Sequence, residues 1–418
     1  MSAADLLVDL DDIQPWHVDF YQDLHRNPEL SFQEVRTSGL VSERLRTLGY
    51  DVHTGIGGTG LVGILRNGDG PTVLARADMD ALPVREATGL PYASTATASD
   101  AEGHQTPVMH ACGHDMHVTC LLAAAQLLAE HQQTWSGTFI ALFQPAEELG
   151  TGARAMVDGG LADVIPKPDV ALGQHVMGLP YDTVAARPGA ALSAADSIRI
   201  TLHGRGTHGS MPHYGVDPIL LGSAVVMRLN AIVSRELAPG HFGVVTVGSF
   251  QSGSKSNVIP ETTTLLLNLR SYDDHTRRQL RAAVERIVQA ECEASGSPAP
   301  PEFEYTDPFP VTQNSPDVYH RVSAAFTAHF GEKAIVMEPS TGSEDFSDIP
   351  NALGTPYLYW IWGGFDPDTY HRAEANGTLG TVIPGNHAST FAPVMTPTFR
   401  TGTSAMTVAL MSYLAHTT

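Results

Sequence analysis

The sequence predicts an α/β fold that carries a smaller α+β domain as an insertion. The larger part is predicted from short apolar runs, bounded by turn residues, that alternate with helical patterns along the chain. The insertion is predicted because the segment between a composition change near Gly189 and a proline-rich stretch at 297–301 has the element order βαββαβ. This order describes a self-contained ferredoxin-like unit.

In the larger part, short apolar runs are predicted to be buried strands, and helical patterns accompany them. The predicted strands are 61–65, 72–77, 138–143, 170–173 and 357–361. The predicted helices are 13–26, 31–48, 115–131, 150–157 and 397–416. Pro28 separates the first two helices, because a proline breaks the helical pattern.

In the insertion, the alternation of apolar and polar residues at 198–202 predicts a strand with one exposed face. Further strands and helices complete the unit. The strands are 241–250, 261–271 and 303–305, and the helices are 219–237 and 274–294. The predicted organisation is one domain built from residues 1–193 and 311–418, interrupted by an inserted domain at 194–310.

Charge and composition argue against some classes of partner and indicate the cellular compartment. Of 418 residues, 42% are hydrophobic and 17% charged, which suits a compact soluble enzyme. The net charge of −21 argues against nucleic acid or an anionic membrane surface as partner, since both need a basic footprint. The three cysteines form no disulfide framework, the first residues lack signal-peptide character, and no apolar run reaches the length of a membrane span. A cytoplasmic protein without a membrane partner is expected.

The run from Met109 to His117 is the strongest chemical signal. It places a thiol, three imidazoles and a carboxylate in nine residues, just ahead of an apolar helical segment. Such soft and borderline ligands are those that a divalent transition metal needs. Cys112 and His114 are two residues apart and project to one side of an extended segment, and a helix N-terminus there would favour the thiolate. The alternative is a solvated, histidine-rich helix start with an incidental buried cysteine.

More ligand-type residues follow the predicted strands. Asp78 and Asp80 come after 72–77, Glu147 and Glu148 after 138–143, and His175 after 170–173. In open α/β sheets, sites form at the carboxyl ends of strands. A single acidic pair at such a position is usually a helix cap. Three strands ending in this way, together with the cysteine-histidine run, favour a metal site instead.

Two other patterns allow a different interpretation. The run 55–60 matches G-x-G-x-x-G, but a strand-like run follows it, so a glycine turn in a hairpin is favoured over a dinucleotide site. Cys112 and His114 could instead be a thiol nucleophile and its base. Their closeness in sequence is a poor match for such a pair, which the fold normally brings together.

Seven segments of the sequence resemble the M20 metallopeptidase family, in the right order and over nearly the whole chain. These segments are 76–83, 109–115, 143–148, 173–175, 206–208, 257–261 and 386–387. Within that family the pattern, including the opening run 25–31, is similar to the amidohydrolase branch of hippurate hydrolases, auxin-conjugate hydrolases and N-acyl-amino-acid deacylases. The resemblance implies a mixed-sheet di-metal hydrolase domain with an inserted ferredoxin-like α+β dimerisation domain, and hence a homodimer or dimer-based oligomer.

The resemblance also implies roles for individual residues. The implied metal ligands are Cys112, His114, Glu148, His175 and His387. Glu147 resembles the general base, and Asp80 the aspartate that orients a ligand. The wider family commonly has a histidine in place of Asp78, and this branch uses the Cys112 motif instead. Two divalent ions are implied, and zinc, manganese, cobalt and nickel all suit such a mixed site. His110 and His117 have no implied role and are expected to be surface or packing residues.

Substrate contacts are implied from the inserted domain. His208 is expected to stabilise the negative oxygen formed during amide hydrolysis, reaching into the site of a partner subunit. Asn257 and Arg270 are expected to hold the free carboxylate of the substrate. The segment 342–346 is expected to line the site. The expected reaction cleaves an N-acyl amino acid into a carboxylate and a free amino acid. The alternatives are a metallo-dipeptidase or carboxypeptidase of the same fold, a non-catalytic metal-binding protein, and a cysteine hydrolase.

Overall fold

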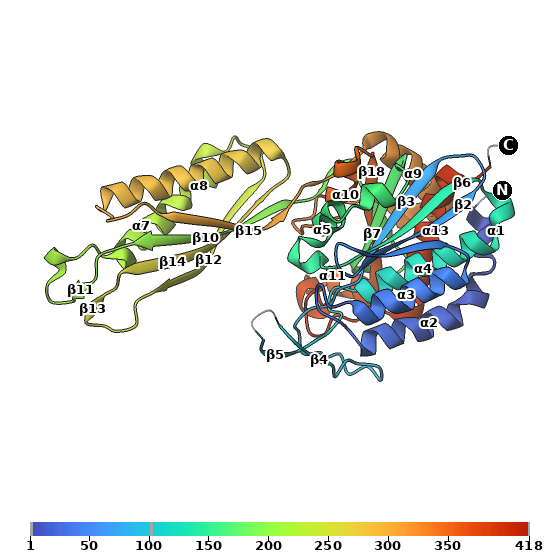
Figure 1. Cartoon of the computed structure of the whole chain (residues 1–418), viewed down its shortest axis with the longest axis horizontal. Helices are drawn as coiled ribbons and strands as arrows, with labels where there is room; N and C mark the ends of the chain where they lie inside the picture. The colour runs from blue at the N-terminus through green and yellow to red at the C-terminus, as the bar shows by residue number, and fades with distance from the viewer. Residues whose placement is uncertain (1–2, 101–102, 417–418) are drawn as a thin grey trace. The chain divides into compact units, whose positions relative to one another are not determined.

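The computed structural model describes residues 3–100 and 103–416, which form two compact units. Unit 1 contains the chain up to Ala191, the segment Gln313–Glu338 and the chain from Asp345 onward. Unit 2 contains Leu192–Thr312 together with the short segment Pro339–Glu344 (Figure 1). The chain therefore leaves unit 1, forms unit 2 and returns to unit 1.

Unit 1 is built on a mixed sheet of eight strands in the order β1-β2-β6-β3-β7-β18-β8-β17. The four central strands β6, β3, β7 and β18 run parallel. Strands β1 and β2 pair antiparallel with their neighbours, and β8 pairs antiparallel with β18 but parallel with β17. The strands are β1 (Asp51–Ile56), β2 (Gly60–Asn67), β3 (Thr72–Asp78), β6 (Gly137–Gln144), β7 (Val170–Pro180), β8 (Val184–Ala186), β17 (Ala334–Val336) and β18 (Tyr357–Phe365). The predicted mixed α/β fold is confirmed.

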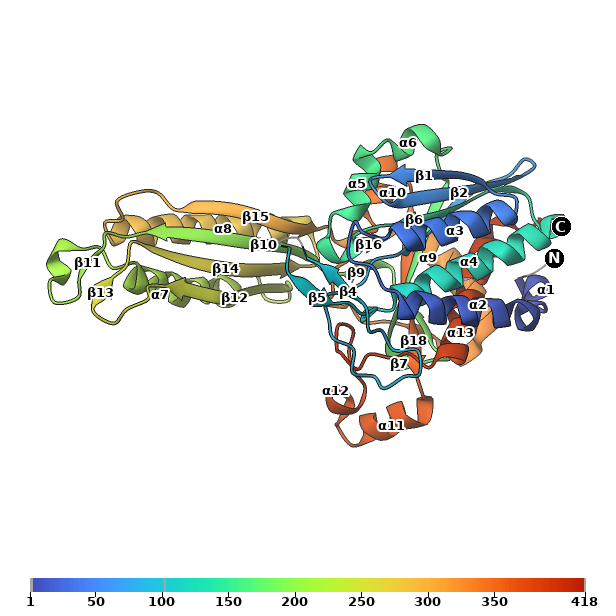
Figure 2. The same ribbon diagram turned by 60° about the horizontal axis from the view of Figure 1, so that its bottom comes forward.

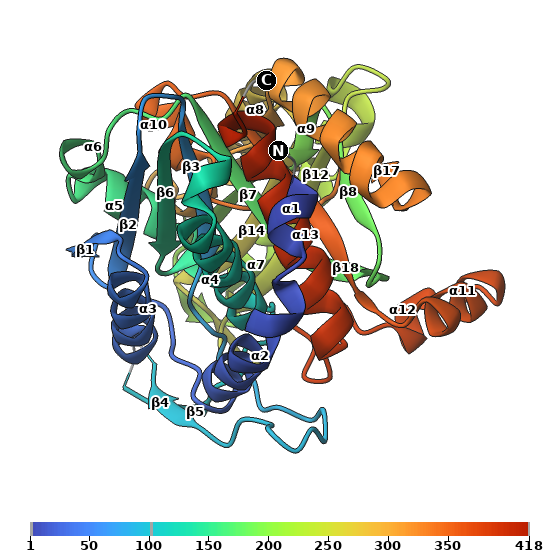
Figure 3. The same ribbon diagram turned by 90° about the vertical axis from the view of Figure 1, so that its right-hand side faces the viewer.

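Helices surround this sheet. The helices of unit 1 are α1 (Ala3–Leu7), α2 (Leu10–Arg26), α3 (Val35–Thr47), α4 (His114–Glu130), α5 (Gly152–Asp158), α6 (Leu161–Val164), α9 (Pro316–Phe330), α10 (Asp348–Leu353), α11 (Pro367–Ala375), α12 (Leu379–Val382) and α13 (Met395–Leu414). Helices α4 and α13 lie side by side on one face of the sheet (Figure 3). Helix α4 is buried from His114 to Leu128, because α2 and α13 flank it and the sheet lies beneath it. Its start is therefore fixed rigidly in the core.

Two predicted boundaries in unit 1 differ markedly from the structure, and several elements, among them β8, β17 and helices α9 to α12, were not predicted. Strand β7 continues to Pro180, so His175 lies inside the strand rather than after it. The helix predicted from residue 31 begins only at Val35, because the four residues before it form turns whose polar groups bind other segments. Strand β1 was not predicted, although its pairing with β2 gives the hairpin expected around the glycine run. Short β4 (Thr97–Ser99) and β5 (Gln105–Pro107) form a separate hairpin.

Unit 2 has the predicted element order, with four antiparallel strands in the order β12-β14-β10-β15. Its elements are β10 (Ala194–His203), α7 (Pro218–Leu229), β12 (Gly243–Ser252), β14 (Thr262–Ser271), α8 (Asp274–Ala294) and β15 (Glu302–Phe309). Both helices pack on one face of this sheet, where alternate residues of the strands form an apolar core (Figure 2). Asp217 and Asp273 cap the two helices by accepting backbone N–H groups.

The helical stretch Pro218–Glu236 is long and apolar enough, by length and composition alone, to cross a membrane, although no apolar run of that length was expected from the sequence. It packs instead as a two-sided helix: Leu221, Val225 and Leu229 are buried in the core of unit 2. The opposite face exposes Leu220 (71%) and Met227 (76%). Its apolar character therefore comes from two faces, of which one is covered within unit 2.

The short segment Pro339–Glu344 joins unit 2 through polar contacts that the sequence did not predict. Arg270 donates from Nη1 to the carbonyl of Thr341 (2.7 Å) and to Oγ of Ser343 (3.0 Å). Ser193 donates its amide to the carbonyl of Gly342 (2.8 Å). These contacts tie the segment to the end of the four-stranded sheet.

Candidate functional site

Gly113 determines how the cysteine-histidine run enters helix α4. It is the N-cap residue and has a left-handed backbone (φ 87°), so the chain turns sharply between Cys112 and His114. A Cβ atom at this position would lie 2.4 Å from Cγ1 of Val176 on the neighbouring strand β7. Only glycine permits both the turn and this close approach. The turn, rather than the alternation of an extended segment, brings Cys112 and His114 to the same side.

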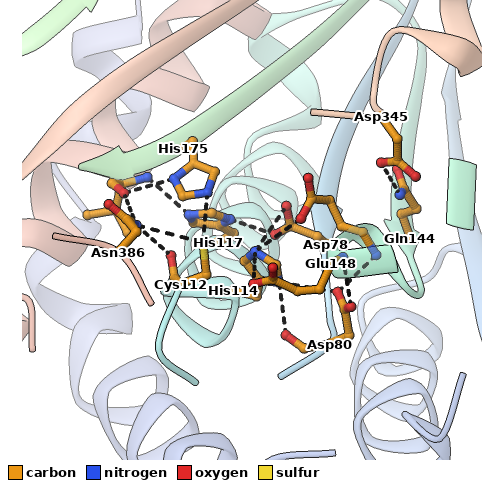
Figure 4. A network of polar contacts seen from close by, with 12 residues as sticks. Asp78, Asp80, Cys112, His114, His117, Gln144, Glu148, His175, Asp345 and Asn386 are labelled. Atoms are coloured by element: carbon orange, nitrogen blue, oxygen red, sulfur yellow. Dashed lines mark hydrogen bonds and ion pairs between the residues drawn. The ribbon is translucent and has the colours of Figure 1, made fainter. Parts of the chain in front are cut away.

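The five predicted metal ligands converge in unit 1. Figure 4 shows four of them, Cys112, His114, Glu148 and His175. Sγ of Cys112 lies 3.3 Å from Nε2 of His175, and Oε2 of Glu148 lies 3.3 Å from Nε2 of His387. Ligand atoms of Cys112, His114 and His175 lie within 4.8 Å of one another, as do those of Cys112, Glu148 and His387. The two groups share the Cys112 sulfur, so these five residues would hold two divalent cations close to each other.

Two buried atoms in this cluster have no hydrogen-bond partner among the described residues. They are Nε2 of His114 and Oε1 of Glu148, which lie 3.8 Å apart. Buried polar atoms are normally satisfied, because removing them from water without a partner costs free energy. A cation between them would satisfy both. The donor set therefore fits a metal ion on a physical ground that does not depend on any resemblance.

The pKa shifts of the site residues also favour a bound cation. Burial, with the carboxylates of Asp80 and Asp78 adding to it, raises the pKa of Glu148 to about 8 despite the opposing charge of His114. Burial lowers the pKa of His175, which keeps its imidazole in the neutral form that binds metals. Burial and the Glu148 charge raise the pKa of the Cys112 thiol, so the helix N-terminus does not by itself produce the thiolate expected from the sequence. A divalent cation would supply the missing positive charge.

Asp80 orients the ligands with both of its oxygens. Oδ1 accepts from Nδ1 of His114 (3.2 Å) and from the amide of Glu147 (3.1 Å). Oδ2 accepts from the hydroxyl of Ser31 (2.7 Å) and from the amide of Glu148 (3.0 Å). Because Nδ1 of His114 is held in this way, its Nε2 is directed toward the cluster. This geometry is that of a residue that fixes the orientation and the basicity of a ligand.

Glu147 lies beside the cluster with an almost fully buried side chain. Its Oε2 is 3.9 Å from Nε2 of His114, and it begins the short 3-10 turn η2 (Glu147–Leu149) that also presents Glu148. Ala146, directly before it, has a left-handed backbone (φ 49°) that residues other than glycine rarely adopt. The two glutamates are adjacent in sequence, and this turn brings both side chains to His114.

Asp78 has a different set of partners from the ligands. It forms an ion pair with Arg76 (2.6 Å) and a contact of 2.5 Å with Nδ1 of His117, and all three side chains are buried. His117 accepts the amide of Val176 at its other nitrogen (3.0 Å). His117 thus lies between Asp78 and strand β7, and together with Asp78 and His114 it also forms a group that could hold a metal ion. His110 is also buried, and neither of its ring nitrogens has a hydrogen-bond partner among the described residues.

Asp345, from the segment expected to line the site, extends this buried network. Its Oδ1 accepts from Nε2 of Gln144 (2.6 Å) and from Arg76 (3.3 Å), and its Oδ2 accepts from the amide of Ala153 (Figure 4). Asp115, which the sequence grouped with the ligands, accepts instead from Nδ1 of His25 (2.7 Å). Its carboxylate is therefore used in structural support.

Asn386 connects three ligands, although the sequence suggested no role for it. Its Nδ2 donates to the carbonyls of Cys112 (3.2 Å) and Val176 (3.1 Å), and the latter carbonyl also accepts from Nδ1 of His175 (2.8 Å). The next residue, His387, has a left-handed backbone (φ 71°) and donates its amide to Ala111. This strained conformation is held by the contacts around it. The only sequence signal was its position next to a predicted ligand.

The predicted substrate contacts His208, Asn257 and Arg270 all belong to unit 2. His208 lies in β11 (Thr207–His208) and pairs with β13 (Val258–Ile259), directly after Asn257. Arg270 lies near the far end of β14, paired with Val244 and Ala195. The nine residues from Thr262 to Arg270 are separated by eight steps, which span roughly 27 Å at about 3.4 Å each. Within unit 2, His208 and Arg270 are therefore too distant to contact one small molecule together.

Comparison with known proteins agrees with this geometry. Residues 74–379 match the family described as peptidase family M20/M25/M40. Thermostable carboxypeptidase 2 of Saccharolobus solfataricus is 34% identical over 388 residues, covering 92% of each chain. Hippurate hydrolase of Campylobacter jejuni is 36% identical over 345 residues, covering 82% of this chain and 86% of the relative.

A solved structure is similar over the same extent. The YXEP protein of Bacillus subtilis, described as a dinuclear metal binding peptidase from the M20 family, superposes with a TM-score of 0.75 at 25% identity. The match covers 96% of this chain and 98% of that protein. Residues 74–379, which match the family, contain most of the ligand cluster and all of unit 2. The chain therefore belongs to peptidase family M20/M25/M40.

Proposed function

We propose that the protein is a metal-dependent amidohydrolase that cleaves N-acyl amino acids into a carboxylate and a free amino acid. The observation that carries this proposal is the convergence of a thiol, three imidazoles and two adjacent glutamates on one cluster, which is largely buried but leaves His387 exposed. A purely structural metal site would be closed by its ligands and would have no use for an additional carboxylate such as Glu147 beside it. The arrangement favours catalysis over metal storage.

Cys112, His114, Glu148, His175 and His387 would hold two divalent cations, as the description of the Bacillus relative suggests. When bound, such ions lower the pKa of a water molecule and polarise the amide carbonyl. Zinc, manganese, cobalt and nickel all suit a site that mixes sulfur, nitrogen and oxygen donors. Asp80 keeps His114 oriented through its contact with Nδ1.

Glu147 is the general base in this proposal. Its carboxylate accepts the proton of the attacking water and passes it to the nitrogen of the leaving amine. Both transfers balance, because the carboxylate ends the cycle in the form in which it began. Its position beside His114 and the buried cluster supports this role, since proton transfer requires a base within reach of the reacting atoms.

The substrate class follows from what the relatives have in common. A hippurate hydrolase and a carboxypeptidase both cleave an amide whose amine side is an amino acid with a free carboxylate. Arg270 is proposed to bind that carboxylate by a paired contact, and Asn257, which adjoins His208 and is therefore distant from Arg270 of its own chain, is proposed to bind it from the partner subunit. Arg270 already donates to Thr341 and Ser343, which suits a residue whose position is fixed before substrate binds.

A substrate panel tests this proposal and separates it from the peptidase alternative. Purified protein, loaded in turn with zinc, manganese, cobalt or nickel, is assayed with acetyl, benzoyl and longer-chain acyl amino acids and with dipeptides. We expect hydrolysis of at least one acyl amino acid, with little turnover when the substrate carboxylate is replaced by an amide. Turnover of dipeptides alone would assign a dipeptidase. Metal binding without any turnover would assign a non-catalytic protein.

The proposed assembly is a cytoplasmic homodimer formed through unit 2. The exposed apolar face of Pro218–Glu236, with Leu220 and Met227, supports an interface, since monomers rarely expose such rows of side chains. The distance along β14 also supports it: His208 and Arg270 of one chain cannot contact one small substrate together. In a dimer, His208 would act in the site of the partner subunit and Arg270 in the site of its own.

Replacing His208 with alanine is expected to lower kcat by about 10² to 10³, because a donor aimed at a developing oxyanion has an effect of this size. Metal content should be unchanged, since His208 belongs to unit 2 and the ligands to unit 1. The matched control is His213→Ala, an exposed histidine in the same loop, which should retain activity.

Subunit mixing then tests the partner assignment. Heterodimers of His208→Ala and His114→Ala chains should regain activity, because one hybrid site combines intact ligands with an intact histidine. If exchange of subunits is demonstrated by mass and no activity returns, His208 does not act across the interface.

A further inference from the structure

Ala146 and the two glutamates that follow it each donate a backbone N–H group to a buried carboxylate. Glu147 donates to Oδ1 and Glu148 to Oδ2 of Asp80. Ala146 donates to Oε1 of Glu34 (2.9 Å), whose side chain comes from a segment more than a hundred residues earlier. Asp80 is accounted for by its contact with His114, whereas Glu34 has no role in the reaction described above.

Glu34 is fully buried and is itself held on both oxygens. Its Oε1 also accepts the amide of Phe32 (2.9 Å), and its Oε2 accepts the hydroxyl of Thr59. Burying a carboxylate costs free energy unless it is hydrogen-bonded, so the buried position of Glu34 depends on all three donors. Its contacts join the start of α3, the β1–β2 hairpin and the turn that presents Glu147.

The glycine run of the β1–β2 hairpin makes this contact possible. A Cβ atom on Gly60 would lie 3.0 Å from Cδ of Pro145 and 2.4 Å from the carbonyl oxygen of Ile56. The absence of a side chain lets the hairpin approach the turn closely enough for Thr59 to reach Glu34. The run that matches G-x-G-x-x-G thus contributes to packing behind the turn.

We propose that Glu34 is a positioning residue for the reaction: by holding the amide of Ala146 it keeps that residue in its left-handed conformation and so fixes the direction of the Glu147 carboxylate. Without Glu34, the φ of 49° at Ala146 loses the contact that opposes its relaxation. Glu34 lies behind the turn and acts through Ala146, not on the substrate. This proposal rests on the assignment of Glu147 as the base.

The interaction requires an oxygen acceptor rather than a negative charge. Burial and the charge of Asp80 raise the pKa of Glu34 to about 7, so its neutral form is accessible near neutral pH. The carbonyl oxygen of a glutamine can accept from Ala146 and Phe32 in the same place, and its amide can donate to Thr59. Glutamine at position 34 is therefore the conservative replacement, and alanine is the disruptive one.

The test compares Glu34→Ala and Glu34→Gln with Glu29→Ala. Glu29 is the matched control, because its side chain lies in the same segment but, among the described residues, accepts hydrogen bonds from Arg36 and Thr37 alone. We expect Glu34→Ala to lower kcat on the order of 10²-fold, the effect of a displacement of about 1 Å, with KM and metal content near those of the wild type. Glu34→Gln and Glu29→Ala should retain most of kcat.

Hydrogen exchange measured by mass spectrometry on a peptide spanning 144–150 provides a readout that does not depend on activity. Exchange at this turn should accelerate in Glu34→Ala and stay slow in Glu34→Gln and Glu29→Ala. Unchanged exchange in Glu34→Ala overturns the proposal, as does faster exchange with unchanged kcat. A loss of kcat in Glu34→Gln equal to that in Glu34→Ala would show that the ionised carboxylate itself is required, which also overturns it.

Two further outcomes remain decisive. If Glu34→Ala does not fold, Thr59→Val removes one donor to Glu34 and should give a smaller loss of kcat with faster exchange; no change in either would overturn the proposal. If the wild type hydrolyses no acyl amino acid or dipeptide, the proposed function fails. The exchange experiment then still decides whether Glu34 holds the turn.

Discussion

Replacing Glu147 with glutamine is expected to abolish most turnover while the protein keeps its fold and its metal. The amide of glutamine cannot accept a proton at neutral pH, and a positioned general base contributes about 10² to 10⁴ in rate. The substitution preserves the size of the side chain, and the amide of residue 147 still donates to Asp80. The measurements are kcat, with the best substrate of the panel, and metal content by elemental analysis.

The neighbouring substitution Glu148→Gln is the matched comparison. Glu148 contacts His387 and belongs to the same ligand group as Cys112, so its replacement should reduce metal content as well as activity. The two variants differ by one position on the same turn and by no other chemistry. Equal loss of metal in both would contradict the division of roles between base and ligand.

Removal of the metal ions is expected to reduce hydrolysis to the background rate and to lower the melting temperature. Activity should fall because Glu147 alone cannot make water a sufficient nucleophile. Stability should fall because a ligand bound only by the folded state stabilises it by about 2.7 kcal/mol at a free concentration of 100 times its Kd. The metal-free protein would also leave Nε2 of His114 and Oε1 of Glu148 buried without a partner among the described residues.

Restoration of activity by added metal is the control for damage during chelation. The same experiment excludes the thiol-nucleophile alternative, since a cysteine hydrolase would remain active after chelation. Alkylation of Cys112 does not distinguish the two, because it would stop both mechanisms. Full activity in exhaustively metal-free protein would contradict the metal-dependent mechanism.

Much of the fold was readable in the sequence because its signals are local. Apolar runs predicted most strands of the central sheet, and the pattern of the insertion predicted the four long strands and the two α-helices of unit 2 in order, but not the short strands β11 and β13. The errors lie where a boundary depends on distant contacts. Strand β7 runs on to Pro180 because β18 pairs with it along nearly its whole length. The segment before α3 is not helical because Ser31 and Glu34 bind Asp80 and Ala146 instead.

For the candidate site, too, part could be predicted from the sequence and part depends on distant contacts. The sequence alone determined which residue types the site uses, because thiol, imidazole and carboxylate side chains occur in motifs with chemical meaning. It could not determine that Asp78 pairs with Arg76 and His117, since an aspartate after a strand is compatible with a ligand, a cap or an ion pair. The choice among these depends on which cation is nearest, and that is a property of the packed core.

What the sequence determined by itself was therefore the family, the order of the elements that it predicted and the identity of the chemical groups; helices α9 to α12 and strands β8 and β17 were not predicted from it. Only the tertiary structure decided how those groups are oriented. The left-handed backbones at Ala146 and His387 are not preferred locally and exist because contacts from distant segments hold them. Glu34, Asn386 and Gly113 have no chemical signature of their own, yet each sets the direction of a predicted ligand or base. The physical reason is that chemistry depends on residue type, which is local, whereas geometry depends on contacts between residues far apart in the chain.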